Sequence, residues 1–153
     1  RGIELDKPHG RKDWYQVKVL IMRWCLHVKL ACNYEAISAL LIGTGSKQIV
    51  ETSPDGDFWG GTYKNSGDKK VLVGVNMFGQ LLMELRQNIL EKDKSELLIV
   101  RPLTISDFLL FGHPIQAVDG NNAGQILEDL QKASVPGSEV NQLSLFQRAP
   151  SSI

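Results

Sequence analysis

Acidic and aromatic residues gather in one glycine-rich stretch of the chain, and their types suit chemistry on a sugar. Glu51 ends a short apolar run, Asp55 and Asp57 flank a glycine, and Trp59 is followed by two more glycines. Carboxylates stabilise the positive charge that develops when a glycosidic bond breaks, or orient an attacking water. An aromatic plate beside them suits a ligand with a flat base and a sugar. We therefore expect Glu51, Asp55 and Asp57 to be catalytic.

Each of these residues also has a simpler structural interpretation. Glu51 alone is typical of the solvated end of a strand, and the two aspartates are typical of an Asx-type turn. Trp59 alone would suit a plug at the base of a loop. The case for a site depends on all of them occurring together, because desolvation and neighbouring charges move the pKa of a carboxylate beside an aromatic wall.

Asn76 follows the glycine-rich stretch and is predicted to begin a helix. Its residue type is typical of a helix N-cap, and that role alone would explain it. A helix start after a glycine-rich segment can also bind phosphate through its free backbone N–H groups. Gly74 and Gly79 fit such a site, although the pattern is neither a P-loop nor a dinucleotide-binding fingerprint. At Gly79 the missing side chain predicts a close approach of another backbone segment.

The bulk composition is that of an ordinary soluble globular domain. The chain has 153 residues, of which 42% are hydrophobic and 22% charged, and this length suits one domain. Lys+Arg and Asp+Glu both number 17, so net charge gives no argument for nucleic acid. No signal peptide and no apolar run long enough for a bilayer is visible. Cys25 and Cys32 lie about two helical turns apart, too far for a disulfide, and indicate a reduced, cytoplasmic protein.

The hydrophobic pattern predicts an α+β fold dominated by helices, with a few short strands. In the helix expected over 13–33, the predicted buried stripe comprises Trp14, Val17, Ile21, Trp24, Val28 and Ala31. Asp13 is expected in the first turn of this helix. In the helix expected over 76–90, the predicted core face comprises Phe78, Leu81, Leu82, Leu85 and Ile89. Helices are expected over 13–33, 35–42, 76–90 and 122–132, strands over 48–51 and 97–100, and a long loop over 52–71 whose part 64–70 is the most mobile. Thr104 to Asp107 has the spacing of a capping box ahead of the apolar run 108–111.

Several segments together resemble the NADAR family, also called YbiA-like. The matching pieces are Arg11-Lys12-Asp13-Trp14 with Val17-Lys18 and Met22, Leu26 to Lys29, Leu40-Leu41 with Thr44-Gly45, Ile49-Val50-Glu51, Phe58-Trp59-Gly60, and Gly74-Val75-Asn76 through Gly79, Leu82-Met83 and Arg86. They span roughly residues 11–91, in the family's order and near its spacing. The family's Ser-Glu-His helix is not found in this chain, and Gly56 stands where the family tends to place an aspartate.

The resemblance implies an N-glycosidase that hydrolyses a base–ribose bond, in riboflavin-pathway intermediates or in ADP-ribosylated guanine. It places Glu51 and the neighbouring aspartates in the polar site. Residues that bind substrate or shape its pocket would be Trp14, Trp59, Gly60, Asn76 and Gly79. No cofactor and no metal is expected, since the three histidines show no ligand spacing. The alternatives are a catalytically inactive module that binds ADP-ribose or a nucleotide, and a protein-interaction domain.

The resemblance also sets the expected organisation of the chain. Residues 1–96 would form the NADAR-like domain, with the N-terminal half of the family missing, and 97–132 an extension packed on it. Residues 133–153 would be a loosely ordered tail. Since the chain begins at Arg1 without a Met, we expect a fragment, a processed chain or an incomplete gene model. Expected partners are a small-molecule nucleotide or ADP-ribosylated base, and a partner chain or homo-oligomer that supplies the missing half.

Overall fold

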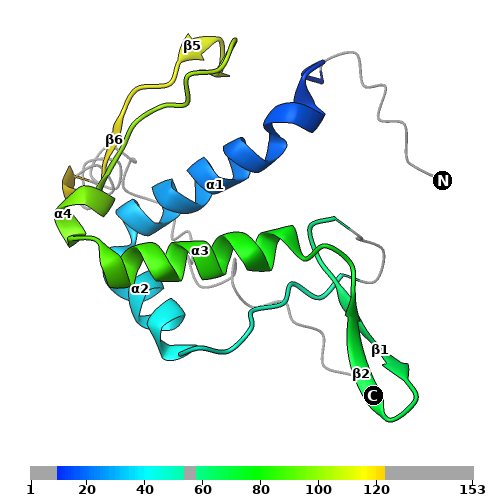
Figure 1. Cartoon of the computed structure of the whole chain (residues 1–153). Helices are drawn as coiled ribbons and strands as arrows, with labels where there is room; N and C mark the ends of the chain where they lie inside the picture. Colours follow the sequence, from blue (N-terminus) through cyan, green and yellow to red (C-terminus); the bar gives the residue numbers. More distant parts are fainter. Residues whose placement is uncertain (1–9, 54–57, 123–153) are drawn as a thin grey trace, which may run out of the picture.

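Three helices build the core of the fold in the computed structural model, which describes residues 10–53 and 58–122 (Figure 1). They are α1 (Trp14–Cys32), α2 (Tyr34–Gly43) and α3 (Met77–Glu91), and the short helix α4 (Lys94–Leu97) follows. α1 contacts both α2 and α3, and α2 also contacts α3. The core between them, to which α4 adds Leu97, consists of buried aliphatic side chains: Leu26, Leu30, Leu41, Leu81, Leu85, Ile89 and Leu97.

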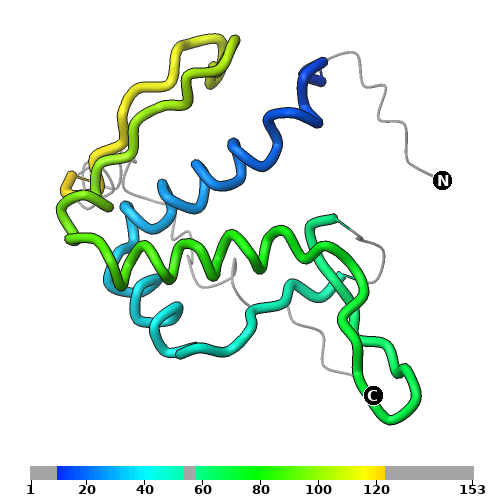
Figure 2. Tube along the Cα trace, in the orientation of Figure 1, coloured from blue at the N-terminus to red at the C-terminus, as the bar shows by residue number. Residues whose placement is uncertain are grey.

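The strands of the described residues form two-stranded antiparallel sheets. β1 (Thr62–Ser66) pairs with β2 (Lys69–Val73) in a hairpin that projects away from the helices (Figure 2). β3 (Ile99–Val100) pairs with β6 (Val118–Asp119), which leads into the 3-10 helix η1 (Gly120–Asn122). β4 (Leu109–Leu110) pairs with β5 (His113–Pro114). The predicted α+β fold, dominated by helices and with a few short strands, is confirmed.

α1 is buried on two sides, and this explains why its predicted stripe is only partly correct. Leu26 and Leu30 belong to the core shared with α2 and α3, and Val19 and Met22 pack against that core. The predicted stripe instead faces the C-terminal segment: the Trp24 ring meets Phe108 edge-on at 5.0 Å, and its Nε1 donates to the Arg101 carbonyl. Ala31 is buried where Gly120 approaches so closely that a Cβ there would overlap the Ala31 carbonyl. Trp14, the first residue of that stripe, is 42% exposed.

α3 follows the sequence prediction closely. Its predicted core face is confirmed, since Leu81, Leu85 and Ile89 are buried while Phe78 and Leu82 pack on the core. Arg86, on its flank, donates to Thr44 Oγ1 at 2.6 Å and to the Lys47 carbonyl at 2.9 Å. These bonds fasten the turn after α2 to α3, so this arginine serves the fold.

The segment between α2 and α3 differs from its prediction. Residues 48–51 do not form a strand, and Thr52 makes only a single parallel bridge with Gly61. The long loop predicted over 52–71, with its mobile part 64–70, contains the paired β1–β2 hairpin instead. Gly67 supplies the positive φ of 60° in its tight turn, a conformation that glycine adopts without a steric penalty. The strands were missed because neither has the alternating pattern of a strand with one buried face: β1 is mostly polar, and β2 has two lysines followed by three apolar residues.

The segment after α3 also differs from its prediction. The strand predicted over 97–100 is reduced to β3, because Leu97 still belongs to α4. Thr104 to Asp107 does not begin a helix; Asp107 has a φ of 51°, and the apolar run that follows forms β4 and the turn to β5. Phe111 and Gly112 occupy that turn with φ of 51° and 80°, and two positive values are typical of the type I′ hairpin turn. The helix predicted over 122–132 lies outside the described residues apart from its first residue, which belongs to η1.

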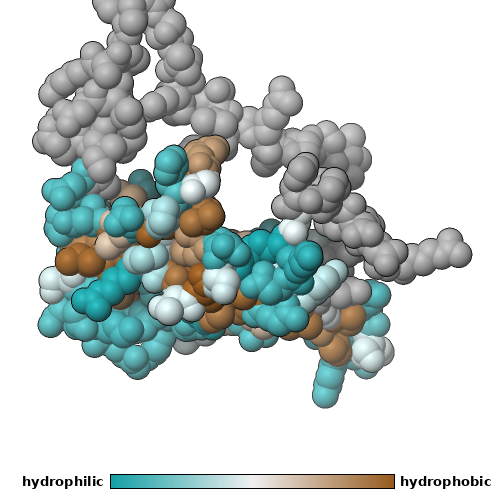
Figure 3. Space-filling view, turned by 90° about the horizontal axis from the view of Figure 1, so that it is seen from above, coloured by the Kyte–Doolittle hydropathy of each residue, from teal (hydrophilic) through white to brown (hydrophobic). Residues whose placement is uncertain are grey.

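Apolar side chains also reach the surface. Figure 3 shows brown apolar residues between teal polar ones on one face, and Phe111 at the tip of the β4–β5 hairpin is 94% exposed. In the described part of the chain, no single helix has the length and apolar character needed to cross a membrane; only α1 and α2 together pass that test, as a pair bent by 112°.

The shared core makes a direct prediction for α3. Leu85→Ala removes a side chain that is 2% exposed, so it should lower the free energy of unfolding by about 2–5 kcal/mol. Leu90→Ala on the same helix is the matched control, because Leu90 is 61% exposed and its loss should change stability little. Urea unfolding followed by circular dichroism measures both. Equal effects of the two substitutions would contradict this assignment of the core.

Candidate functional site

The predicted site residues from Glu51 to Gly79 that the structure describes meet where three segments converge. The loop of residues 58–61 lies against the N-terminus of α3 on one side and against residues 49–53 on the other. Backbone hydrogen bonds make the first contact: the N–H groups of Asn76, Met77 and Phe78 donate to the carbonyls of Gly60, Phe58 and Trp59, at 2.9, 3.0 and 3.0 Å. The contact with residues 49–53 includes the N–H of Gly61, which donates to the Glu51 carbonyl at 2.9 Å. The four residues of this loop are thus held on both sides.

These bonds change the interpretation of the α3 N-terminus. The sequence suggested that its N–H groups could bind a phosphate, a role that needs donors free of protein partners. Three of the donors at this end are used by the loop of residues 58–61. The helix end therefore holds the loop in place.

Asn76 connects all three segments. It is 2% exposed and has a left-handed backbone with φ of 52°, a conformation that asparagine tolerates better than most residues. Its Nδ2 donates to the Ile49 carbonyl at 2.8 Å, and its Oδ1 accepts from the Glu51 N–H at 3.0 Å. Asn76 stands at the N-cap position as predicted, but its side chain makes no capping bond. The side chain that was expected to bind substrate thus holds the segment that carries Glu51.

Gly60 and Gly79 permit this close assembly. A Cβ on Gly60 would lie 2.7 Å from the Glu51 carbonyl oxygen, and one on Gly79 would overlap the Ile49 carbonyl and the Asn76 amide. Real Cβ atoms do not approach so closely, so a larger residue at either position would force the segments apart. The predicted close backbone approach at Gly79 is confirmed, and both glycines act by shaping the junction.

Glu51 is the candidate catalytic residue whose position the structure describes. Its backbone is held at both ends, by Asn76 on its N–H and by Gly61 on its carbonyl, while its side chain is exposed. A carboxylate on a fixed backbone at the surface can meet a ligand without large rearrangement. Asp55 and Asp57 lie outside the described residues.

The two predicted aromatic residues differ in surroundings. Trp59 is half-buried against the core and meets Phe58 edge-on, with ring centroids 5.0 Å apart. Trp14, at the start of α1, keeps much of its ring exposed. The structure adds Lys18, one helical turn after Trp14, whose Nζ lies 3.5 Å from the centroid of the Phe58 ring. The sequence reasoning did not select Lys18 as a site residue, although its i, i+4 spacing from Trp14 places the two on one helix face.

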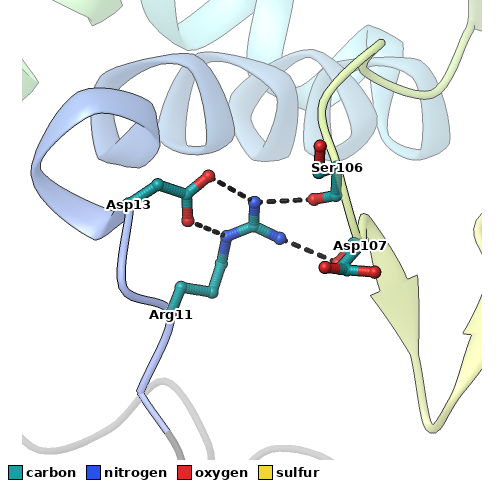
Figure 4. Close-up of polar contacts among 4 residues, drawn as sticks. All are labelled: Arg11, Asp13, Ser106 and Asp107. Atoms are coloured by element: carbon teal, nitrogen blue, oxygen red, sulfur yellow. Dashed lines mark hydrogen bonds and ion pairs between the residues drawn. The ribbon is translucent and has the colours of Figure 1, made fainter.

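Arg11, which precedes α1, makes a different kind of contact (Figure 4). Its guanidinium forms a two-bond ion pair with Asp13 and also donates to the carbonyls of Ser106 and Asp107, at 2.7 and 2.8 Å. The hydrogen bonds from Arg11 hold the pKa of Asp13 below its ordinary value. Asp13 was expected in the first turn of α1; it lies just before the helix and pairs with Arg11 instead. The arginine thereby fastens the C-terminal segment beside the start of α1.

A shallow pocket elsewhere on the surface contains none of the predicted site residues. It is lined by His27, Ser95, Glu96, Leu97, Ile99, Val100 and Arg101. Burial, and then the charge of Lys92, lower the pKa of His27. Across the described residues, no group of three or more His, Cys, Asp or Glu side chains is arranged to hold a metal ion. Both cysteines are free, and burial raises the pKa of the Cys25 thiol, which disfavours its reactive form.

Comparison with known proteins places these residues in a family. The family model described as NADAR domain matches residues 4–90. N-glycosidase YbiA of Escherichia coli (strain K12) is 37% identical over 88 residues, which are 58% of this chain and 49% of that protein. N-glycosidase Npun_R5314 of Nostoc punctiforme is 37% identical over 79 residues, 52% of this chain and 46% of that protein.

The chain therefore spans about half the length of these two curated relatives. A third, the chloroplastic riboflavin biosynthesis protein PYRR of Arabidopsis thaliana, is 35% identical over 80 residues, 52% of this chain but 12% of that protein. No solved structure matches the chain significantly. The matched region contains the whole junction around Asn76 and ends before the segment that Arg11 fastens.

The junction predicts that Asn76 matters through its side chain as well as through its backbone. Asn76→Gly keeps the left-handed conformation accessible but leaves the Ile49 carbonyl and the Glu51 N–H without their partner, each at a cost of about 1–3 kcal/mol. Asn76→Ala should destabilise the fold further, because alanine resists this backbone conformation. Asn65→Gly, in the exposed β1 strand, is the control. Chemical denaturation that finds Asn76→Gly as stable as this control would contradict the role assigned here.

The lowered pKa of His27 predicts a dependence of stability on pH. Because the folded protein disfavours the charged imidazole, the unfolded chain binds the proton more tightly. The His27 contribution is therefore present above the ordinary histidine pKa of about 6.5 and is lost as pH falls from there through the lower pKa of the folded protein. Between pH 7.5 and 5 the wild type should lose more stability than His27→Gln, in urea unfolding at each pH. His113→Gln, at an exposed position, should keep the wild-type slope; identical slopes for all three would contradict the prediction.

Proposed function

We propose, because the chain belongs to the NADAR domain family, that it acts as an N-glycosidase on a base–ribose bond. The substrates would be riboflavin-pathway intermediates or ADP-ribosylated guanine. Relatives named N-glycosidase and riboflavin biosynthesis protein support this direction, each over part of its own length. The cytoplasmic location and the partner chain or homo-oligomer expected from the sequence stay predictions.

The observation that carries the proposal is the exposed carboxylate of Glu51 on a backbone fixed by Asn76 and Gly61. Loss of the base leaves positive charge on the anomeric carbon of the ribose, and a preorganised carboxylate stabilises that charge more than a mobile one does. Glu51 would hold this charge or orient the water that attacks the anomeric carbon. Asp55 and Asp57 would assist from the adjacent loop. None of these steps needs a metal ion.

The aromatic residues would bind the base. A flat heterocycle stacks on an exposed ring, and Trp14 offers such a ring at the first turn of α1. Trp59, half-buried on the core, would contribute an edge or wall. Gly60, Asn76 and Gly79 would shape the site by keeping the three segments in contact, with no need for their own side chains to touch the ligand.

Chromatographic assay of base release tests the proposal. Purified protein is incubated separately with ADP-ribosylated guanosine and with a phosphoribosyl-aminopyrimidine. The wild type should release free base from at least one of them, and Glu51→Gln should lower kcat by about 100-fold or more, the usual cost of a lost electrostatic stabiliser. Asp57→Asn should also lower it.

Glu96→Gln is the matched control, since Glu96 is an exposed carboxylate in the pocket that holds no predicted site residue. Unchanged unfolding of Glu51→Gln in urea would separate a catalytic loss from a folding defect. A Glu51→Gln variant that turns over at the wild-type rate would refute the role of Glu51. Binding of ADP-ribose with no release of base from either compound would favour a binding module over an enzyme.

A further inference from the structure

We propose that Lys18 is the residue that selects phosphorylated substrates in this site, by binding a phosphate group on the ribose of the ligand. The inference rests on the proposed function and adds to it a specificity-determining residue. Its basis is the position of a lysine ammonium group among three aromatic rings, beside the loop that the Asn76 junction holds.

The contacts of Lys18 define its place. Its Nζ lies 3.5 Å from the ring centroid of Phe58, 5.2 Å from that of Tyr15 and 6.0 Å from that of Trp59. An ammonium group above an aromatic face is attracted by the negative face of the ring, so the long side chain of Lys18 is restricted. Tyr15 comes from the same helix, whereas Phe58 and Trp59 come from the loop after the catalytic candidates.

The rings that restrict Lys18 are themselves held. The carbonyls of Phe58 and Trp59 accept hydrogen bonds from the first residues of α3, Met77 and Phe78. Trp59 also packs on the hydrophobic core. A charge placed by a rigid support needs less ordering when a ligand arrives, which strengthens binding.

The ammonium group retains bonding capacity. It carries three N–H donors, and a ring face does not replace a hydrogen-bond acceptor for all of them. Among the described residues, no oxygen accepts a hydrogen bond from Lys18, and the ion pairs found there join Arg11 to Asp13, Arg23 to Glu84 and Lys94 to Glu35. A phosphate oxygen supplies both the acceptor and the opposite charge, and the bond it forms is stronger than a neutral one.

Charge decides which part of the substrate Lys18 can meet. The anomeric carbon becomes positive as the base leaves, so a fixed cation next to it would slow the reaction. Lys18 lies over the ring of Phe58, the first residue of the loop, whereas the backbone carbonyl of Glu51 accepts a hydrogen bond from the N–H of Gly61, its last residue. This separation suits a ribose whose anomeric carbon faces the carboxylate and whose phosphate-bearing end faces the cation.

Trp14 fits the same arrangement. It precedes Lys18 by one helical turn on the same face of α1, and its ring is exposed. A base stacked on Trp14 and a phosphate bound by Lys18 would belong to one ligand. The chemical class is thus a nucleoside, or nucleoside-like compound, with a phosphate ester on its ribose.

Steady-state kinetics on two matched substrates test the proposal. One is a phosphoribosyl-aminopyrimidine and the other is the same compound after removal of its phosphate. Lys18→Gln should raise KM for the phosphorylated substrate by about tenfold or more, the worth of a charge-assisted hydrogen bond, with a smaller change in kcat. It should leave the dephosphorylated substrate unaffected.

The controls separate phosphate binding from other roles. Lys18→Arg keeps the charge and the ring contact and should recover most of the affinity, while Lys29→Gln, at an exposed position of the same helix, should behave as wild type. An equal fall in kcat on both substrates would indicate a proton donor and overturn the proposal, as would an unchanged KM. If Lys18→Gln does not fold, Lys18→Met, which keeps an apolar stem on the ring, takes its place.

Isothermal titration with ADP-ribose keeps this proposal separate from the glycosidase proposal. If the wild type turns over neither substrate, the enzymatic function fails, but the affinity for ADP-ribose still tests Lys18. Lys18→Gln should then raise Kd about tenfold or more relative to wild type and Lys29→Gln. Equal affinities, or no binding by the wild type, would overturn the role of Lys18.

Discussion

The buried side chain of Asn76 is the interaction on which the candidate site depends. The side-chain amide of Asn76 donates to the carbonyl of Ile49 and accepts from the N–H of Glu51, the two backbone groups that flank Val50. The backbone N–H of Asn76 donates to Gly60, in the loop that contains Trp59. The bonds of Asn76 join all three segments, and the bonds of Gly61, Met77 and Phe78 add to them. Since unsatisfied polar groups in such a place are costly, the segments are fixed relative to α3, and α3 in turn is fixed by its leucine face.

In the proposed site, the residues that would contact a ligand differ from the residues that hold the backbone in place. Gly60 and Gly79 pack closely against other backbone segments of the junction, and the side chain of Asn76 forms hydrogen bonds within it. The side chain of Glu51 is exposed at this junction, and α1 contributes the exposed Trp14 and the half-buried Lys18, which lies over the Phe58 ring. A rigid interior with a polar and aromatic rim is the organisation that preorganised binding sites require.

Local patterns in the sequence predicted the elements whose cause is local. The spacing of Leu81, Leu85 and Ile89 identified α3 and its buried face, and the absence of a side chain at Gly79 indicated a close approach. The role of the Asn76 side chain could not be found in this way, because its partners lie 25 and 27 residues earlier in the chain. Lys18 was not selected for the same reason, since its shortest aromatic contact, 3.5 Å to the Phe58 ring, joins a helix to a distant loop. The capping-box spacing of Thr104 to Asp107 suggested a helix start that does not form. The residues after it form the β4–β5 hairpin instead.

The bonds from the Arg11 guanidinium to Ser106 and Asp107 have a consequence for the order in which the chain folds. It joins residues 95 positions apart, so it closes a very long loop, and the entropy of that closure must be overcome before the contact contributes. The three-helix core, whose contacts are more local, can form first, and the C-terminal segment then docks along α1. In the native state the residues around Ser106 and Asp107, whose bonds to Arg11 are exposed, should open and exchange their amide protons before the parts of the same segment that pack on Trp24 and Ala31.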